Sequence, residues 1–311
     1  MKQVVFGTGS IGAALADTLA VQGHKVVAVN RSGNAATGSG VEVIAGDASD
    51  RAFTKSVAEG AEVIYQCLNP PYTKWPELFP ALQAGVFDAA AASGAKLVAL
   101  ENLYMYGPTD GAPLTEDLPY AATGSKGKTR ARMAQDLLDA HQSGIVRVAM
   151  GRASDYFGPR GLVSAMGERV FYPALAGKKA SVMGDPDQPH TYSYIPDIVA
   201  GLVKLGADDR ADGRAWHLPN APALTTRQFI AKIFETLGTS PGVSAMPRFM
   251  VSLVGLFNGN VRELKEMLYE FEEPFVVDSS AFESTFGQSA TPLDEAIPTT
   301  IDWFRQNPKK S

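Results

Sequence analysis

The sequence has little cysteine and histidine: its 311 residues include one cysteine, Cys67, and four histidines. A single cysteine excludes a disulfide bond within the chain. The histidines are scattered and lack the spacing of a zinc motif, so we expect no bound metal. Stability must then come from an apolar core. The hydrophobic fraction of 45% is enough for one large α/β unit or for two lobes.

Charge of one sign and long apolar runs are also scarce. The chain has 28 basic and 33 acidic residues, a net charge of -5 and no dense lysine/arginine segment, which argues against a nucleic-acid partner and favours a small-molecule partner. The longest apolar run, residues 249–257, is interrupted by Ser252 and Gly255 and is too short to span a bilayer. The first residues do not read as a secretion signal. We therefore expect a cytoplasmic protein without a membrane partner.

Short apolar segments alternate with amphipathic segments in the first half of the chain. We predict strands at residues 3–6, 25–29, 41–45, 62–67, 96–100 and 145–150, and helices at 11–22, 50–58, 80–92 and 125–141. Parallel strands need a crossover connection, and right-handed crossovers dominate. The alternation therefore predicts an α/β fold, a doubly wound parallel Rossmann sheet with helices on both faces.

This rhythm changes after Pro159. Here we predict a helix at 162–175, a strand at 180–183, a strand-turn-helix at 191–205 and further elements at 224–237, 261–271 and 292–306. We infer a dinucleotide-binding Rossmann domain over residues 1–160, completed by about 190–220. A smaller substrate-binding lobe, residues 161–189 and 221–311, is expected to pack over the carboxyl ends of the strands.

A glycine-rich turn follows the first predicted strand directly. The pattern is G-x-G-x-x-G, and its residues are Gly7, Thr8, Gly9, Ser10, Ile11 and Gly12. The first glycine permits the tight turn, the second lets backbone N–H groups approach a pyrophosphate, and the third lets the following helix pack close to the strand. The helix N-terminus then faces the phosphates. This context predicts a dinucleotide site rather than an ordinary glycine turn.

The end of the second predicted strand carries an arginine in place of an acid. NAD-binding chains tend to have Asp or Glu about 20 residues beyond the glycine motif, whereas this chain reads Asn30-Arg31-Ser32. Arg31 can bind an adenosine 2′-phosphate with a charge-assisted fork, and Asn30 and Ser32 offer neutral hydrogen bonds. We therefore expect NADP(H) to be preferred over NAD(H). The alternative is an arginine that is solvated in a turn.

Two further strand ends are expected to contact the cofactor. Ligands of doubly wound sheets bind at the carboxyl ends of the strands. Gly46 and Asp47 follow the third predicted strand, where they can bond the adenine edge. The fourth ends at Cys67, which places Leu68 and Asn69 beside the nicotinamide ribose.

More segments follow the glycine motif in a characteristic order. They are Tyr106-Gly107-Pro108, Arg152 to Pro159, Met183-Gly184-Asp185, His190 to Asp197, and Phe275 to Ser280 followed by Leu293 to Ala296. Together these segments, from Met1 to about Trp303, resemble the extended and atypical branches of the short-chain dehydrogenase/reductase superfamily, the NAD-dependent epimerase/dehydratase-like group. The resemblance implies a Rossmann fold and a nicotinamide dinucleotide. A pair of helices often forms a dimer in such folds, so a homodimer is one expected assembly.

The catalytic pair typical of that family is missing from its usual place. Members use a tyrosine with a lysine four residues later on one helix, and none of the ten tyrosines here has a lysine at that distance. The resemblance also implies an upstream serine, which is replaced by Asn102. The remaining candidates for proton transfer, substrate binding and ribose binding are Asn102, Tyr104, Tyr106, Tyr120, Lys126 and Lys128. The alternatives are packed tyrosine rings and lysines at a solvated helix start.

Lys128 is the preferred ribose contact. It lies nine and ten residues before Leu137 and Leu138, which is close to a whole number of helical turns. Lys126 is the other option.

The substrate region is less informative. Arg152, Asp155 and His190 are candidates for a polar pocket, with structural ion pairs as the alternative. Family members that act on nucleotide-sugars usually have arginine at the position of His190, so a diphosphate-bearing substrate would lose a strong positive partner.

Three functions are compatible with these observations. The first is an NADP(H)-dependent oxidoreductase that moves hydride to or from a carbonyl or alcohol carbon of a small molecule. The second is an epimerase or dehydratase with tightly bound NADP. The third is a non-catalytic regulator that senses NADP(H). Fold analogy favours an enzyme.

Overall fold

The computed structural model describes residues 1–240, 242–246 and 265–309, which divide into two compact units. The first unit comprises Met1–Met105, Ala122–Arg152 and Ile198–Trp216. The second comprises Tyr106–Ala121, Ala153–Asp197 and the described part of His217–Ser311. Residues 106–121 and 153–160 thus group with the second unit, although the sequence analysis assigned them to the dinucleotide-binding domain. These two segments come after the strands that end at Glu101 and Arg152, where the chain leaves the central sheet.

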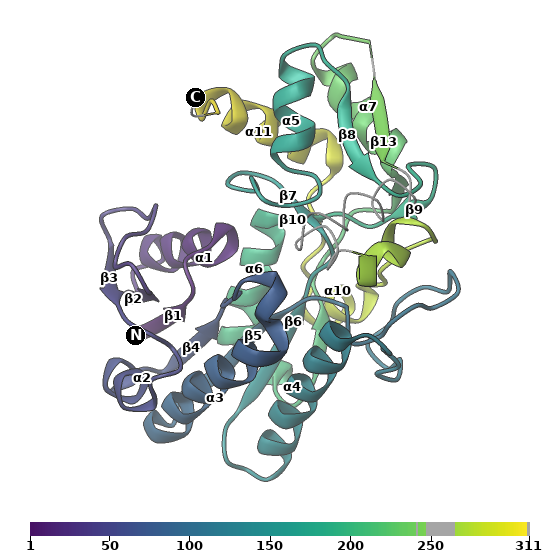
Figure 1. Ribbon diagram of the computed structural model, residues 1–311. Helices are drawn as coiled ribbons and strands as arrows, with labels where there is room; N and C mark the ends of the chain where they lie inside the picture. Colours follow the sequence, from purple (N-terminus) through teal and green to yellow (C-terminus); the bar gives the residue numbers. More distant parts are fainter. Residues whose placement is uncertain (241, 247–264, 310–311) are drawn as a thin grey trace. The chain divides into compact units, whose positions relative to one another are not determined.

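The first unit is built on a seven-stranded sheet with the order β11-β6-β5-β4-β1-β2-β3 (Figure 1). Its strands are β1 (Lys2–Phe6), β2 (Lys25–Asn30), β3 (Val41–Ala45), β4 (Val63–Gln66), β5 (Lys96–Glu101), β6 (Val148–Arg152) and β11 (Ala215–His217). Neighbouring strands from β6 to β3 pair in parallel. The predicted Rossmann sheet is confirmed, and β11 is a strand that the sequence analysis did not predict.

Helices cover both faces of this sheet. They are α1 (Ser10–Val21), α2 (Arg51–Ala58), α3 (Trp75–Ser93), α4 (Ser125–Gln142) and α6 (Ile195–Ala207). Gln66 of β4 donates a hydrogen bond of 3.2 Å to Gln83 of α3, while the preceding residue, Tyr65, packs against Gly206 of α6. Successive strand residues point to opposite faces, so α3 and α6 lie on opposite sides. The helices α2, α3 and α4 lie side by side (Figure 1).

The starts of two helices, α3 and α5 (Glu168–Leu175), differ from the prediction by five or six residues. Helix α3 begins at Trp75 rather than at Pro80, because Pro76 occupies its first turn and Pro80 is accommodated inside it. Helix α5 begins six residues later than predicted. The preceding segment folds back instead, with the N–H of Glu168 bonded to the carbonyl of Leu162 at 3.0 Å. A Cβ on Gly167 would lie 2.2 Å from the carbonyl oxygen of Gly161, so this close turn requires glycine.

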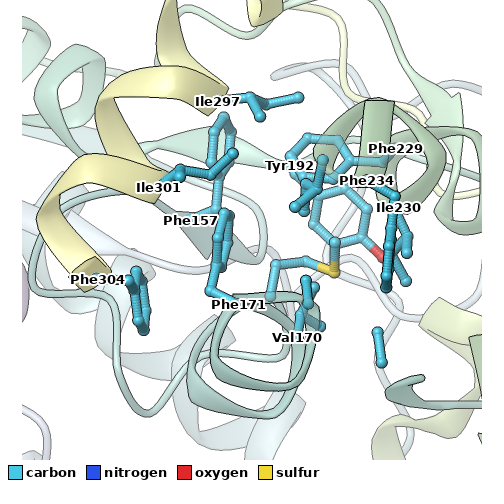
Figure 2. Close-up of a cluster of buried hydrophobic side chains, with 14 of the residues drawn as sticks. Phe157, Val170, Phe171, Tyr192, Phe229, Ile230, Phe234, Ile297, Ile301 and Phe304 are labelled. Carbon is cyan, nitrogen blue, oxygen red and sulfur yellow. The ribbon is translucent and has the colours of Figure 1, made fainter. Parts of the chain in front are cut away.

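The second unit has its own apolar core (Figure 2). The core lies among α5, α7 (Thr226–Thr236) and α11 (Leu293–Gln306), and the Phe171 and Phe304 rings stack there at 4.8 Å. The remaining elements of this unit are β7 (Tyr156–Phe157), β8 (Ala180–Met183), β9 (Pro189–His190), β10 (Ser193–Tyr194), β12 (Leu224–Thr225), β13 (Val243–Met246), η3 (Lys265–Phe271) and α10 (Ser280–Phe286). The start of the element predicted at 261–271 and the apolar run at 249–257 lie outside the described residues.

The short 3-10 helices of the first unit are η1 (Tyr72–Lys74) and η2 (Asp209–Ala211). No helix in the described ranges is long and apolar enough to cross a membrane.

Candidate active site

The glycine turn brings the ends of β1 and β4 against the start of α1. Gly7 has φ +98°, and its N–H bonds the carbonyl of Val29 at 2.9 Å. A Cβ on Gly7 would lie 2.4 Å from the carbonyl oxygen of Cys67, and a Cβ on Gly12 would lie 2.0 Å from the carbonyl oxygen of Gly7. Both positions therefore require glycine. Gly9 caps α1 and is exposed, and a Cβ there would have no neighbour within 4 Å.

The other three residues of the motif lie in the same turn. Thr8 and Ser10 are partly exposed, whereas the side chain of Ile11 is buried in the core. Ile11 can therefore contribute only its backbone N–H to a ligand. The first N–H groups of an α-helix have no partner within the helix, so this turn has the backbone chemistry of an anion site.

Asn30 organises the turn that follows β2. Its amide nitrogen donates to Thr8 Oγ1 at 2.6 Å, and its amide oxygen accepts from the N–H groups of Ser32 at 3.0 Å and Gly33 at 2.7 Å. The side chain thus joins the Arg31 turn to the glycine turn. Arg31 and Ser32 are exposed at this turn. An exposed guanidinium beside a glycine turn is available to an anionic ligand.

Asp47 lies near Arg31. It accepts hydrogen bonds from the Ser49 N–H at 2.9 Å and the Ser49 hydroxyl at 2.8 Å. These bonds, with a smaller contribution from the charge of Arg31, lower the pKa of Asp47. Gly46 is needed for packing, since a Cβ there would lie 2.0 Å from the Phe53 ring. Asp47 is therefore an ionised carboxylate near Arg31. The sequence analysis placed Asp47 at the adenine edge but did not predict that it lies near Arg31.

The end of β4 lies at the point where the strand order reverses. The chain proceeds from β1 to β2 and β3 on one side and from β4 to β5 and β6 on the other, so β1 and β4 flank the crevice in which doubly wound sheets bind ligands. Leu68 and Asn69 follow β4 at this edge. Burial raises the pKa of the Cys67 thiol to about 12, so this group is neutral at pH 7.

An aromatic cluster follows the end of β4. The Trp75 ring contacts the Tyr72 ring edge-on at 5.1 Å and stacks on the Tyr104 ring at 5.7 Å. Lys126, in the first turn of α4, places its Nζ 4.7 Å from the centre of the Tyr72 ring. Two candidates of the sequence analysis, Tyr104 and Lys126, thus meet in the first unit with Tyr72, which the sequence analysis missed.

The two candidate lysines occupy different environments. Lys126 is 1% exposed, whereas Lys128 is exposed to solvent. Lys126 lies eleven residues before the buried Leu137, which is three full helical turns. Lys128 lies only nine and ten residues before Leu137 and Leu138, which is less than three full turns. The geometry therefore favours Lys126 as the lysine of this site.

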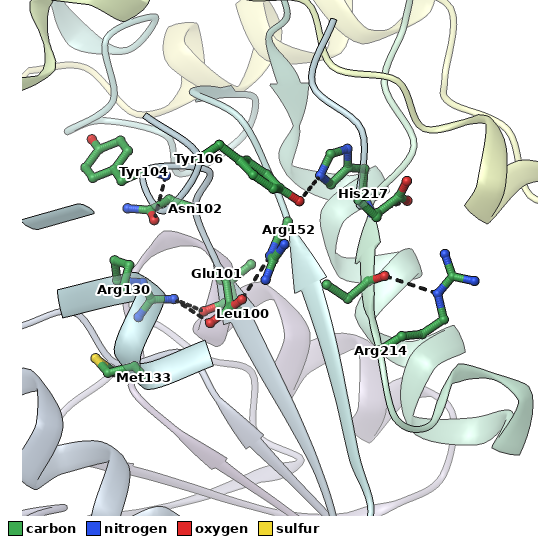
Figure 3. A network of polar contacts seen from close by, with 12 residues as sticks. Leu100, Glu101, Asn102, Tyr104, Tyr106, Arg130, Met133, Arg152, Arg214 and His217 are labelled. Atoms are coloured by element: carbon green, nitrogen blue, oxygen red, sulfur yellow. Dashed lines mark hydrogen bonds and ion pairs between the residues drawn. The ribbon is translucent and has the colours of Figure 1, made fainter. Parts of the chain in front are cut away.

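A buried ionic triad lies beneath the loop that carries Asn102 (Figure 3). Glu101 Oε1 lies 3.3 Å from Arg130 Nη2, and Glu101 Oε2 lies 3.0 Å from Arg152 Nε. All three side chains are at most 3% exposed. The sequence analysis gave two possible roles for Arg152, a substrate contact or a structural ion pair. The structure shows the ion pair, with Glu101. Asn102 Oδ1 accepts from the N–H of Tyr104 at 3.4 Å, which shapes the loop.

Tyr106 and Tyr120 belong to the second unit. The Tyr106 hydroxyl bonds Nε2 of His217 at 2.8 Å, and both residues are at most 1% exposed. His217 Nδ1 in turn lies 3.0 Å from the carbonyl oxygen of Asp278. Tyr120 contacts the Tyr106 ring edge-on at 6.1 Å. These contacts fix the Tyr106 hydroxyl in an internal network.

Asp155 and His190 are brought together in the second unit. His190 Nε2 lies 3.1 Å from Asp155 Oδ2, and His190 Nδ1 lies 2.9 Å from the carbonyl oxygen of Glu270. The two contacts engage both ring nitrogens of His190, one with a carbonyl oxygen and one with a carboxyl oxygen. The His190 ring also stacks on Phe271 at 5.1 Å. Both ring nitrogens are thus committed to bonds within the protein.

Glu270 is buried beside this pair. Burial, with a further contribution from Asp155, raises its pKa well above 4.5, and its Oε1 has no hydrogen-bond partner among the described residues. The carboxyl group is thus neutral at mildly acidic pH in the folded protein, although it ionises in the unfolded chain. Glu270 therefore stabilises the fold less as the pH rises above 4.5.

Substituting glutamine for Glu270 tests this linkage. The unfolding free energy of Glu270→Gln relative to the wild type is expected to rise by about 1 kcal/mol between pH 5 and pH 7, because the unfolded wild type gains from ionisation and the variant does not. Urea titrations at several pH values measure the difference. Glu235→Gln, at an exposed position on α7, is the control and should show no such trend. A flat difference for Glu270→Gln would mean that Glu270 is ionised in the fold.

The described parts of the chain bring no group of three or more histidine, cysteine, aspartate or glutamate side chains together in a way that could hold a metal ion.

Comparison with known proteins identifies the family. The model of the NAD dependent epimerase/dehydratase family matches residues 4–218. The chain therefore belongs to this family, and it is an epimerase/dehydratase-like enzyme. The resemblance to the extended short-chain dehydrogenase/reductases is thereby confirmed.

Two curated relatives are similar over much of their length. The UDP-glucose 4-epimerase of Mycolicibacterium smegmatis is 25% identical over 335 residues, which cover 98% of this chain and 99% of the relative. The dTDP-glucose 4,6-dehydratase of Streptomyces griseus is 23% identical over 230 residues, which cover 71% of this chain and 62% of the relative.

Solved structures have the same fold. DesIV, a dTDP-glucose 4,6-dehydratase from Streptomyces venezuelae with NAD and TYD bound, aligns with a TM-score of 0.79 at 16% identity and covers 99% of this chain and 98% of its own. The epimerase Mth375 from Methanothermobacter thermautotrophicus aligns with a TM-score of 0.80 at 17% identity, over 98% and 92%. These likenesses concern the fold.

Proposed function

We propose that the protein is an NADP(H)-dependent oxidoreductase that moves hydride to or from a carbonyl or alcohol carbon of a small molecule. The observation that carries the cofactor preference is the exposed Arg31. It lies in the turn after β2, which the Asn30 side chain joins by hydrogen bonds to Thr8 of the glycine motif. The solved relative DesIV has NAD bound, so this preference would distinguish the chain from that relative.

The residues of the first unit fit a bound dinucleotide. The glycine turn offers backbone N–H groups to the pyrophosphate, and a side chain at Gly9 would fill the open space above it. Lys126 is the residue that we assign to the nicotinamide ribose, in place of Lys128. When bound, the nicotinamide supplies the hydride. The protein's part is to orient the substrate, with Asn102 as a neutral hydrogen-bond donor.

The substrate is inferred to lack a diphosphate. Both nitrogens of His190 are bonded within the protein, to Asp155 and to the carbonyl of Glu270, so neither is available to a phosphate. Arg152 is bonded to Glu101 and fully buried. The relatives act on sugar nucleotides by their names, which supports a second candidate: an epimerase or dehydratase that retains NADP. Family membership weighs against a non-catalytic sensor.

Calorimetric titration with NADPH and NADH tests the cofactor assignment. The wild type is expected to bind NADPH more tightly, and Arg31→Ala to weaken NADPH binding about 10- to 100-fold with little change for NADH, because one charge-assisted fork to the 2′-phosphate is lost.

Arg51→Ala is the matched control. Arg51 is also an exposed arginine of the first unit, paired with Asp88 at 3.2 Å, and its removal should leave both affinities unchanged. Equal binding of NADPH and NADH by the wild type would refute the NADP preference. Release of NADP from the denatured purified protein, without net consumption of NADPH, would favour the epimerase or dehydratase.

We also infer a cytoplasmic location and a homodimer. Sedimentation velocity of the purified protein tests the second of these.

A further inference from the structure

A tyrosine and a lysine from different elements meet beyond the end of β4. We propose that Tyr72 is the proton-transfer residue of this enzyme and that Lys126 is its cationic partner. The pair would replace, through space, the tyrosine and lysine that related enzymes carry on one helix. This inference rests on the proposed oxidoreductase function, because it names the acid/base group of the same site.

The position of Tyr72 suits this role. Tyr72 begins η1, six residues after β4 ends at Gln66. The carboxyl end of β4 borders the crevice at which the strand order reverses, where ligands of such sheets bind. Leu68, expected beside the nicotinamide ribose, packs against the same aromatic cluster as Tyr72. A phenol here lies on the loop that approaches the reacting end of a dinucleotide.

The surrounding packing orients the Tyr72 ring. Trp75 is 4% exposed and contacts that ring edge-on at 5.1 Å with an interplanar angle of 68°. The Trp75 indole is itself fixed, because its Nε1 donates to the carbonyl of Pro70 at 3.1 Å and its ring contacts the rings of Tyr104 and Phe79. A catalytic side chain needs this kind of support to keep its reacting atom in place.

Lys126 supplies the charge. Its side chain is 1% exposed, and its Nζ lies 4.7 Å from the centre of the Tyr72 ring. A cation near a phenol favours the phenolate form, whereas burial of the Tyr72 hydroxyl opposes it. One helical turn later, Arg130 is paired with Glu101, which is shared with Arg152. Tyr104, whose ring contacts Trp75 as that of Tyr72 does, and the exposed Lys74 of η1 are further titratable groups of this region.

The chemistry balances in the reducing direction. The carbonyl carbon gains the hydride that NADPH loses, and the carbonyl oxygen gains the Tyr72 proton. The products are the alcohol and NADP⁺. The phenolate left on Tyr72 is stabilised by the Lys126 ammonium and regains a proton from solvent. In the oxidising direction, the same phenolate accepts the proton of the alcohol.

Other tyrosines are less suited to this step. The Tyr106 hydroxyl is bonded to His217, and burial raises the pKa of Tyr65. Burial also raises the pKa of Tyr192, whose hydroxyl bonds Thr226 at 2.7 Å. Tyr104 shares the cluster with Tyr72 and is the residue from which an experiment must separate it.

Spectrophotometric titration of tyrosine ionisation, without cofactor, tests the pair directly. The wild type should show about one tenth of its tyrosinate absorbance, one residue of ten, appearing at lower pH than the rest. Tyr72→Phe should abolish this early step, and Lys126→Met should move it to higher pH. Tyr104→Phe, the matched control, should retain it. Circular dichroism at each pH shows whether a variant has remained folded.

The second arm measures NADPH oxidation with a panel of aldehydes and ketones. For a carbonyl that the wild type reduces, Tyr72→Phe should lower kcat by about 100-fold or more and leave the NADPH affinity unchanged. The proposal is overturned if the wild type shows no early ionisation step, or if Tyr72→Phe still shows one. It is also overturned if Tyr72→Phe has the kcat of the wild type. If the panel yields no substrate, the ionisation arm decides. The ionisation arm needs no cofactor, so its result is independent of the Arg31 test.

Discussion

Replacing Glu101 by glutamine is expected to lower the free energy of unfolding by about 3–5 kcal/mol. Glu101 is the anion between two buried guanidinium groups, Arg130 and Arg152, which are 2% and 0% exposed. Burial lowers the pKa of Arg130, and the charge of Glu101 opposes that effect. Without the carboxylate, two cations remain together in an apolar interior. Urea titration followed by circular dichroism measures the loss.

Asp88→Asn provides the comparison. Asp88 pairs with Arg51, whose side chain is 62% exposed, at 3.2 Å in the same unit. Surface pairs contribute little, so this variant should change the unfolding free energy by less than about 1 kcal/mol. If Glu101→Gln costs no more than Asp88→Asn, water reaches the guanidinium groups and the triad is not a buried network.

The sheet of the first unit could be predicted because its signals are local. Its buried strands are short β-branched and aliphatic runs, such as the Val4-Val5-Phe6 run of β1, that end at glycine, asparagine or a charge. Local signals predicted only part of the second unit, such as the strand at 180–183 that is found as β8. Strands of two residues, such as β7, are set by the pairing partner rather than by their own composition. Apolar residues that are in fact exposed, such as Val163 at 86%, gave residues 162–167 the pattern of an amphipathic helix.

Much of the candidate site depends on contacts that are distant in sequence. The glycine turn and Arg31 could be found because each directly follows a strand. The triad joins Glu101 to Arg152 across adjacent positions of β5 and β6, which requires the strand register. Tyr72 and Lys126 are 54 residues apart, and nothing in the sequence near either one indicates the other. A search for a tyrosine and lysine on one helix could not have found them.

Two glycine variants of the same turn are expected to lose different properties, NADPH binding in one and stability of the fold in the other. Gly9→Ala adds a methyl group with no protein neighbour within 4 Å, so the unfolding free energy should change little, while NADPH binding should weaken about 100-fold or more because the methyl group occupies the path of the pyrophosphate.

Gly12→Ala places its methyl group 2.0 Å from the carbonyl oxygen of Gly7, which is backbone and cannot move aside without shifting α1 from β1. Overpacking of this kind should lower the unfolding free energy by about 2–3 kcal/mol. Urea titration and calorimetry on both variants separate the two effects. Gly9→Ala that binds NADPH like the wild type would mean that the pyrophosphate does not pass over Gly9, and the assignment of the turn to a dinucleotide would be wrong.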